Sequence, residues 1–220
     1  MMLEGFKINC FPLNRAIRIS IALPKDYNNT SRYYPVIYFL DGQNLYKDED
    51  SYRGKSLGLE KIIEDLSFNG KEAIYVGIAA ASAPERREAE YATKELADFI
   101  LSSIHPYLLT RYRMNPYVYC FACSKACYTA LLLNQAKEVK GIILLSPVLN
   151  SDNLEQMEFP ADHLMYLYAG KNEENGTCLN TIYALHDLAP HAEIVLDDNA
   201  IHDESSWSSQ ALNALNYLVL

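Results

Sequence analysis

The 220-residue chain is poor in basic residues and has no long apolar run. Its 19 Lys and Arg residues are outnumbered by 28 Asp and Glu residues, which gives a formal charge of −9. A surface of that sign repels phosphate groups, so we expect neither nucleic acid nor a membrane as a partner. Polar residues interrupt the segment 1–18, and no later segment is long and apolar enough to cross a bilayer. We therefore expect neither a signal peptide nor a transmembrane helix.

The chain also lacks the cysteine pattern of a disulfide-bonded or zinc-binding protein. It has five cysteines, an odd number, and no His residues stand near them at the spacing of a zinc site. We therefore expect reduced thiols, a cytoplasmic location and no metal.

Apolar segments of strand length alternate with segments of helical periodicity along the whole chain. This alternation predicts a single α/β domain over residues 1–220, with a mostly parallel central sheet and helices on both faces. Within it, 15–23 reads as an edge strand that stops at Pro24, 34–40 as a central strand, and the polar segment 84–87 as a loop. The predicted strands are 15–23, 34–40, 73–79, 117–121, 141–145, 164–168 and 193–196, and the predicted helices are 57–66, 94–109, 126–135, 181–188 and 207–218.

In such a sheet the loops at the carboxyl ends of the strands converge, and reactive groups gather there. Ser124 stands between a predicted strand and a predicted helix, a turn that exposes the hydroxyl above the sheet. The alternative is that Ser124 only caps the helix. His202 follows the last predicted strand, where an imidazole could take the proton of the serine, although a solvated surface histidine is the alternative. The strand-end rule selects segments 41–44, 123–125, 170–174 and 197–202.

A carboxylate that orients the imidazole is expected just past the strand 164–168. Glu173 lies there, with Glu174, Asp197, Asp198 and Asp203 as rivals.

An oxyanion could be bound by two backbone N–H groups, one from Lys125 and one from Gln43. Gly42 would let the second turn approach closely, although an ordinary Asp-Gly turn accounts for this segment equally well.

Two sequence blocks are specific enough to indicate a family. They are Tyr-Pro-Val-Ile-Tyr-Phe-Leu-Asp-Gly-Gln-Asn at 34–44 and His-Asp-Glu-Ser-Ser-Trp at 202–207. Together with 86–91, 142–147 and 170–173, they resemble, in order, the Putative esterase family of α/β-hydrolases, which includes enterobactin-type esterases, feruloyl esterases and S-formylglutathione hydrolases. The resemblance implies an α/β-hydrolase fold without a large lid domain.

The resemblance also implies a role for each candidate residue. The nucleophile of the family falls on Ser124, its acid on Glu173, its base on His202, and its oxyanion turn on Gly42 and Gln43. The order serine, acid, histidine along the chain is the one expected for this fold.

The chain departs from the family at the turn around the serine. The usual Gly-x-Ser-x-Gly is replaced by Ala-Cys-Ser-Lys-Ala at 122–126, so both glycines are missing. Because alanine is the smallest side chain after glycine, we expect the turn to form, with its neighbours slightly further away. The Lys125 side chain is expected to turn toward solvent or to pair with an acidic group of the ligand.

The function predicted from these residues is hydrolysis of a small acyl or aryl ester through an acyl-enzyme intermediate, with no metal and no organic cofactor. The altered turn leaves two alternatives open: a catalytically impaired relative that binds a ligand or a protein, and an acyltransferase that uses the same serine. The ester itself is not predicted, because its pockets are built from variable loops such as 79–91 and 150–160. A homo-oligomer is compatible with the sequence.

Overall fold

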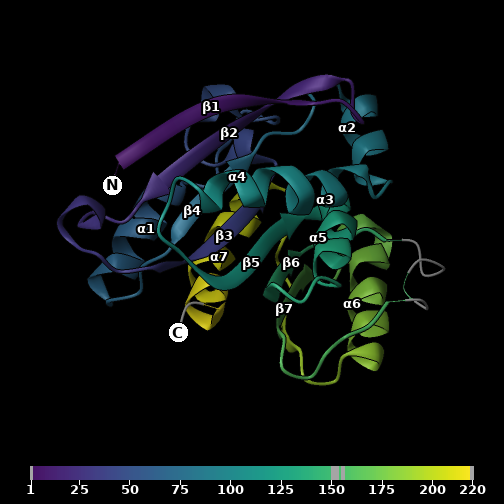
Figure 1. Cartoon of the computed structure of the whole chain (residues 1–220). Coiled ribbons are helices and arrows are strands. Elements are labelled where there is room, and N and C mark those ends of the chain that lie inside the picture. Colours follow the sequence, from purple (N-terminus) through teal and green to yellow (C-terminus); the bar gives the residue numbers. More distant parts are fainter. Residues whose placement is uncertain (1, 150–153, 155–156, 219–220) are drawn as a thin grey trace.

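The computed structural model describes residues 2–149, 154 and 157–218, which form an eight-stranded sheet in the order β1-β2-β4-β3-β5-β6-β7-β8 (Figure 1). From β4 to β8 all neighbouring strands are parallel, and β1 and β2 add an antiparallel ribbon at one edge. The predicted mostly parallel sheet is therefore confirmed. The strands are β1 (Met2–Cys10), β2 (Arg15–Leu23), β3 (Tyr34–Leu40), β4 (Ile74–Ile78), β5 (Met114–Cys123), β6 (Val139–Leu145), β7 (Leu164–Gly170) and β8 (Glu193–Asp197).

Helices cover both faces of the sheet, as the sequence predicts (Figure 1). Helices α1 and α7 pack against one face, and α3 to α6 pack against the other. The α-helices are α1 (Leu59–Phe68), α2 (Pro84–Tyr91), α3 (Glu95–Phe99), α4 (His105–Leu109), α5 (Cys127–Leu133), α6 (Thr177–Leu188) and α7 (Glu204–Leu218). Shorter turns are η1 (Tyr27–Asn29), η2 (Gly42–Asn44), η3 (Asp48–Asp50), η5 (Ser124–Ala126) and η7 (Glu173–Gly176), and η4 (Ile100–Ile104) is a π-helical segment.

The central strands are apolar on both sides because successive side chains point to opposite faces of the sheet. In β3, Val36 and Tyr38 join the core under α3 to α6, whereas Ile37 and Phe39 join the core under α1 and α7. The interpretation of 34–40 as a central strand is confirmed.

Within the described ranges the chain has the α/β-hydrolase fold and no separate lid domain. No helix in these ranges has the length and hydropathy needed to span a membrane.

The prediction that 15–23 is an edge strand is wrong, because β1 pairs with it along its whole length. The sequence of β1 does carry a period-two signal. Phe6 and Ile8 pack on the core and Cys10 is buried, while Lys7 and Asn9 between them are exposed. The signal is weak because the first half of the strand is exposed throughout.

The prediction of a loop at 84–87 is also wrong, since these residues begin helix α2. Pro84 stands in its first turn, where the missing N–H costs nothing. The helix is polar almost all round, so hydrophobic periodicity does not reveal it. Buried polar contacts hold the helix in place instead. Glu90 accepts hydrogen bonds from Arg15 at 2.7 Å, and the hydroxyl of the buried Tyr91 accepts a hydrogen bond from the N–H of Asp41, the residue after β3.

The segment 94–109 is helical as predicted, but a π-helical turn at 100–104 interrupts it. Pro106 follows that turn, and a proline within a helix has no N–H and clashes with the preceding turn. The wider π-turn accommodates it. Helix α6 begins four residues before the predicted 181–188 helix, at Thr177.

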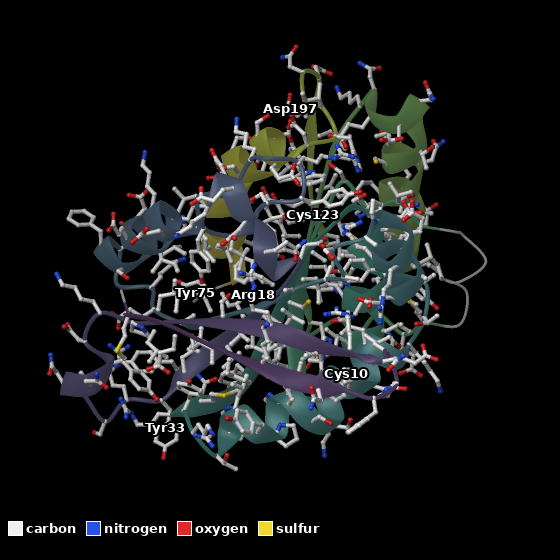
Figure 2. The ribbon with its side chains drawn as sticks, turned by 90° about the horizontal axis from the view of Figure 1, so that it is seen from above. Cys10, Arg18, Tyr33, Tyr75, Cys123 and Asp197 are labelled. Atoms are coloured by element: carbon white, nitrogen blue, oxygen red, sulfur yellow. The ribbon has the colours of Figure 1, made fainter. Side chains whose placement is uncertain are left out.

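All five cysteines are free thiols. Cys120 and Cys123 have the spacing of a Cys-x-x-Cys pair, but they lie on strand β5, where residues three apart face opposite sides of the sheet. Accordingly Cys120 joins one core and Cys123 packs against the other. In Figure 2, Cys123 lies between Asp197 of β8 and Cys10 of β1, as the strand order requires.

Candidate active site

Ser124 stands at the sharp turn between β5 and the helical segment formed by η5 and α5. Its φ of 58° is in the left-handed region that a non-glycine residue rarely adopts. The Ser124 Oγ lies 2.8 Å from Nε2 of His202, and within the described part of the chain no side chain caps η5 or α5. The helix-cap alternative is therefore not what the structure has.

The two alanines that replace the usual glycines do not disrupt this turn. Ala122 still pairs with Leu144 in the parallel ladder, and both Ala122 and Ala126 are completely buried. The expected outcome of a formed turn is confirmed, because the Ser124 hydroxyl is presented to the histidine.

His202 lies in the loop between β8 and α7, and the start of α7 fixes its place. Asp203 caps that helix by accepting hydrogen bonds from the N–H groups of Ser205 and Ser206 at 2.9 and 3.1 Å. The rings of His202 and Trp207 pack nearly at right angles, with centroids 5.2 Å apart and planes at 84°. The imidazole is therefore held in a packed position rather than solvated.

Glu173 is buried at the start of η7, and its Oε2 lies 3.3 Å from Nδ1 of His202. Its Oε1 accepts a hydrogen bond from the Gly170 N–H at 3.0 Å. A Cβ at Gly170 would lie only 2.7 Å from that oxygen, so glycine is needed for the approach. Burial alone would raise the pKa of Glu173, but hydrogen bonds from His202, Ser146 and the Gly170 N–H outweigh it and lower the pKa. The carboxylate is thus ionised beside the imidazole.

The rival carboxylates are used elsewhere. Glu174 is exposed, Asp203 caps α7, and Asp198 pairs with Lys171 at 2.8 Å. Asp197 accepts a hydrogen bond from the Asn199 N–H at 2.8 Å. The geometry favours Glu173 as the partner of His202.

Sequence reasoning missed a residue that supports Glu173 from behind. Ser146 follows β6, has a φ of 49° and is completely buried. Its Oγ accepts a hydrogen bond from Trp207 Nε1 at 2.9 Å, and Ser146 in turn hydrogen-bonds Glu173. The strand-end rule could have selected Ser146, since it is the first residue after a buried strand.

The turn after β3 approaches its neighbour more closely than any side chain would allow. A Cβ on Gly42 would lie 2.4 Å from the backbone nitrogen of Ile78. The Gln43 side chain bridges the turn, donating to Asp41 Oδ1 at 3.1 Å and accepting from the Ala80 N–H at 2.9 Å. Gln43 and Lys125 are each the second residue of a short helical turn, where an N–H has no acceptor within the helix. Their strands β3 and β5 are neighbours.

Helix α2 holds this turn in place. Arg87 makes two hydrogen bonds to the buried Asp41, with Nε 2.8 Å from Oδ1, and the Asp41 N–H donates to the Tyr91 hydroxyl at 3.0 Å. Asp41 has a left-handed φ of 57°. The Lys125 side chain points to the same helix and pairs with Glu88 at 2.6 Å, partly exposed. The expected turn of the Lys125 side chain toward solvent is confirmed. The acidic group that it pairs with is Glu88 of the protein, not a group of a ligand.

Replacing Gly42 with alanine should reduce both stability and activity. The added methyl group would force the turn away from β4, and such overpacking costs about 1–3 kcal/mol. Thermal unfolding and ester hydrolysis of Gly42→Ala should both decline. Gly70→Ala is the control for a loss of stability away from the site, because Gly70 has a left-handed φ of 73° but has no atoms within 4 Å of the new Cβ. The control should lose stability without losing activity, and an equal loss of activity in both would contradict the role of the Gly42 turn.

A hydrogen bond joins the two sequence blocks that indicated the family. Asn44 Nδ2 donates to Oε1 of Glu204 at 3.2 Å, which links the turn after β3 to the start of α7. Glu204 is 4% exposed. Burial raises the pKa of Glu204, with smaller opposing effects from its own N–H and Arg53, and the negative charges of Asp203 and Asp41 add to the rise.

The raised pKa of Glu204 predicts how stability depends on pH. For an acid with a folded-state pKa above the unfolded one, the stabilising contribution is present below the unfolded pKa and is lost as pH rises through the folded pKa. Glu204→Gln cannot ionise and keeps the acceptor for Asn44. Its melting temperature should exceed that of the wild type at neutral pH, and the difference should shrink toward about pH 4. Calorimetry over that range checks this, and a difference that does not change with pH would refute it.

A small pocket of about 50 Å³ opens beside Ser124 and His202. Leu57 and Trp207 contribute apolar surface, and Arg53 and Glu204 contribute polar groups. Arg53 also donates to the His202 carbonyl at 2.7 Å. Of the two loops expected to form the pockets, 79–91 contributes Arg87, and most of 150–160 lies outside the described residues. The loop after β3, which contains Arg53, was not anticipated.

Comparison with known proteins bears on the family and the fold of the chain. The model of the Putative esterase family matches residues 12–213, which is most of the chain. No curated protein sequence matches it.

Solved structures share the fold at low sequence identity. A ferulic acid esterase superposes with a TM-score of 0.79 at 13% identity, covering 99% of this chain and 98% of its own. Enterochelin esterase from Shigella flexneri gives 0.79 at 14% identity over 98% of this chain, and a protein from Capnocytophaga ochracea gives 0.75 at 17% over 98%. The chain spans 57% of the Shigella enzyme and 63% of the Capnocytophaga protein.

Proposed function

Because the chain belongs to the Putative esterase family, we propose that it is a serine carboxylic-ester hydrolase that forms an acyl-enzyme intermediate. The observation that carries the proposal is the continuous contact from Ser124 Oγ to His202 Nε2 at 2.8 Å and from His202 Nδ1 to Glu173 Oε2 at 3.3 Å. This arrangement suits removal of the serine proton during attack on an ester carbonyl.

In the first half of the proposed reaction, Ser124 Oγ bonds to the carbonyl carbon while His202 Nε2 takes the hydroxyl proton. Ionised Glu173 stabilises the imidazolium, which then gives its proton to the leaving alcohol. In the second half, His202 takes a proton from water while the hydroxide attacks the carbonyl carbon of the acyl-enzyme. The bond to Ser124 Oγ then breaks, the imidazolium returns its proton to that oxygen, and the carboxylic acid leaves. The histidine therefore carries one proton in each half.

The carbonyl oxygen becomes negative in both halves of the reaction. We propose that the backbone N–H groups of Gln43 and Lys125 bind it, because both belong to the first turn of a short helix and these turns follow neighbouring strands. The bond between the Gln43 side chain and Ala80 fixes that turn before substrate arrives. Such preorganised donors are effective because they need no rearrangement during the reaction.

The size of the pocket favours a short group at the ester. A pocket of about 50 Å³ is small beside the several hundred Å³ of a typical small-molecule site. We therefore propose that a short acyl group such as acetyl enters it and that a bulky aromatic acyl group is a poor substrate.

An ester panel tests the proposal. Purified protein should hydrolyse activated acetyl esters faster than butyryl esters, and feruloyl esters slowest of all. Preference for the feruloyl ester would contradict the assignment of the pocket. Failure to hydrolyse any ester above the rate of Ser124→Ala would contradict the enzyme proposal and favour a ligand-binding relative.

A further inference from the structure

Cys178 is a buried thiol beside the candidate active site that has no part in the mechanism proposed above. It is the second residue of α6 and is completely buried. Three successive left-handed residues of η7, Glu174, Asn175 and Gly176, turn the chain just before α6. After this turn, the Cys178 Sγ lies 3.7 Å from Nδ1 of His202 and next to Glu173.

The three side chains come from three separate elements and present three different donor atoms. Glu173 supplies a carboxylate oxygen, Cys178 a sulfur and His202 a ring nitrogen, all within 4.8 Å of one another. Among the described residues, these three side chains are the group of at least three His, Cys, Asp or Glu residues whose ligand atoms lie this close together.

The spacing matches that of ligands around one tetrahedral ion. With Zn–S near 2.3 Å and Zn–N and Zn–O near 2.0–2.2 Å, two ligand atoms of a tetrahedral zinc lie roughly 3.3–3.6 Å apart. The observed separations are 3.7 Å between sulfur and nitrogen and 3.3 Å between nitrogen and oxygen. All three atoms lie within 4.8 Å of one another, so side-chain shifts of about 1 Å suffice to place an ion between them.

We propose that Glu173, Cys178 and His202 form a binding site for a thiophilic divalent cation, Zn²⁺ above all, and that occupation of this site inhibits the protein. A mixed sulfur, nitrogen and oxygen set selects zinc over magnesium or calcium, which require oxygen ligands. On binding, the S–H bond of Cys178 breaks and its proton passes to solvent, while the proton on His202 Nδ1 moves to Nε2. Zn–S, Zn–N and Zn–O bonds then form without any change of oxidation state.

Inhibition follows from the atoms that the cation would occupy. The ion would take His202 Nδ1 and a carboxylate oxygen of Glu173, the two atoms that hold the imidazole in its working orientation. The inhibitory part of the inference rests on the proposed function, whereas the binding part does not. In the metal-free protein, burial and the nearby Glu173 raise the pKa of Cys178 to about 12. This thiol is therefore protonated and does not compete with Ser124 as the nucleophile.

Two variants separate this site from other thiols. Cys178→Ser keeps nearly the same volume but replaces sulfur with a poor zinc ligand, and it should retain ester hydrolysis within about twofold. Cys10→Ser is the matched control, since Cys10 is also buried but lies on β1 at the opposite edge of the sheet from β8 (Figure 2).

The test combines binding and inhibition, with the protein preincubated with metal because Cys178 and Glu173 are buried. Co²⁺ added to the wild type should give a sulfur-to-cobalt charge-transfer band at one ion per chain. The band should persist in Ser124→Ala and Cys10→Ser and disappear in Cys178→Ser. Zn²⁺ should inhibit hydrolysis while Mg²⁺ does not, and Cys178→Ser should need about tenfold more Zn²⁺ or higher for half-inhibition.

The outcomes are distinguishable. Absence of the cobalt band in the wild type, or an unchanged zinc response in Cys178→Ser, would overturn the site. A cobalt band that depends on Cys178 in a protein without esterase activity would support the site and reject the proposed function instead.

Discussion

Ser124→Ala should lose at least about 10³-fold in ester hydrolysis while it unfolds at nearly the wild-type temperature. The hydroxyl lines the pocket and lies 2.8 Å from His202 Nε2, so its removal takes away the proposed nucleophile. The fold does not depend on it, because Ser124 is only half-buried and its neighbours Ala122 and Ala126 form the packing of the turn.

Ser124→Gly is the control for backbone strain. At a φ of 58° a side chain costs about 1–2 kcal/mol, and glycine removes that cost while making the unfolded chain more flexible. The glycine variant should therefore be as inactive as the alanine variant and at least as stable. Full activity in either variant would eliminate Ser124 as the nucleophile.

Glu173→Gln should reduce hydrolysis by about 10²- to 10⁴-fold, whereas Glu174→Gln should stay within about twofold of the wild type. An amide at 173 can offer an N–H to His202 Nδ1, which favours the tautomer whose Nε2 carries the proton and cannot accept the proton of the serine. Glu174 is the matched control, since it is the adjacent residue but is exposed. The reverse order of effects would show that the acid has been misassigned, and small equal effects would indicate that His202 works without a carboxylate.

The part of the fold that the sequence predicts well is the part governed by hydrophobic periodicity. Strand β3 is apolar on both sides because it lies in the middle of the sheet, and a continuous apolar run of that length is typical of a strand buried on both faces. Strand β1 carries only a weak period-two signal, because its first half is exposed, and helix α2 is polar almost all round. Helix α2 is held by ion pairs such as Arg15 with Glu90, and these partners are 75 residues apart in the sequence.

The candidate site was predictable from a topological rule rather than from a local pattern. Loops that follow parallel strands converge, so Ser124, Glu173 and His202 could be expected to meet, and they do. Choosing Glu173 over Glu174 from residues alone was not possible, since a one-residue shift in the loop decides which carboxylate is buried. The Gly170 N–H that positions Glu173 becomes visible only in three dimensions.

Two neighbours of the site are not marked by any local sequence pattern, although the strand-end rule could have selected Ser146. Ser146 and Cys178 stand in ordinary surroundings along the chain, and their contacts with Glu173 and His202 depend on left-handed turns at Ser146 and at 174–176. Ser146, Glu174 and Asn175 have a positive φ although none of them is glycine. Because such residues rarely adopt these backbone angles, residue propensity does not predict the turns.

The central claim is that Ser124 is an activated nucleophile, and covalent labelling tests it most directly. Intact mass spectrometry after treatment with a fluorophosphonate should show one adduct per chain, mapped to Ser124 by peptide analysis. The adduct should be absent from Ser124→Ala and from denatured wild type, because activation requires the folded contact with His202. Folded wild-type protein that stays unlabelled, or that carries its adduct on another residue, would contradict the account.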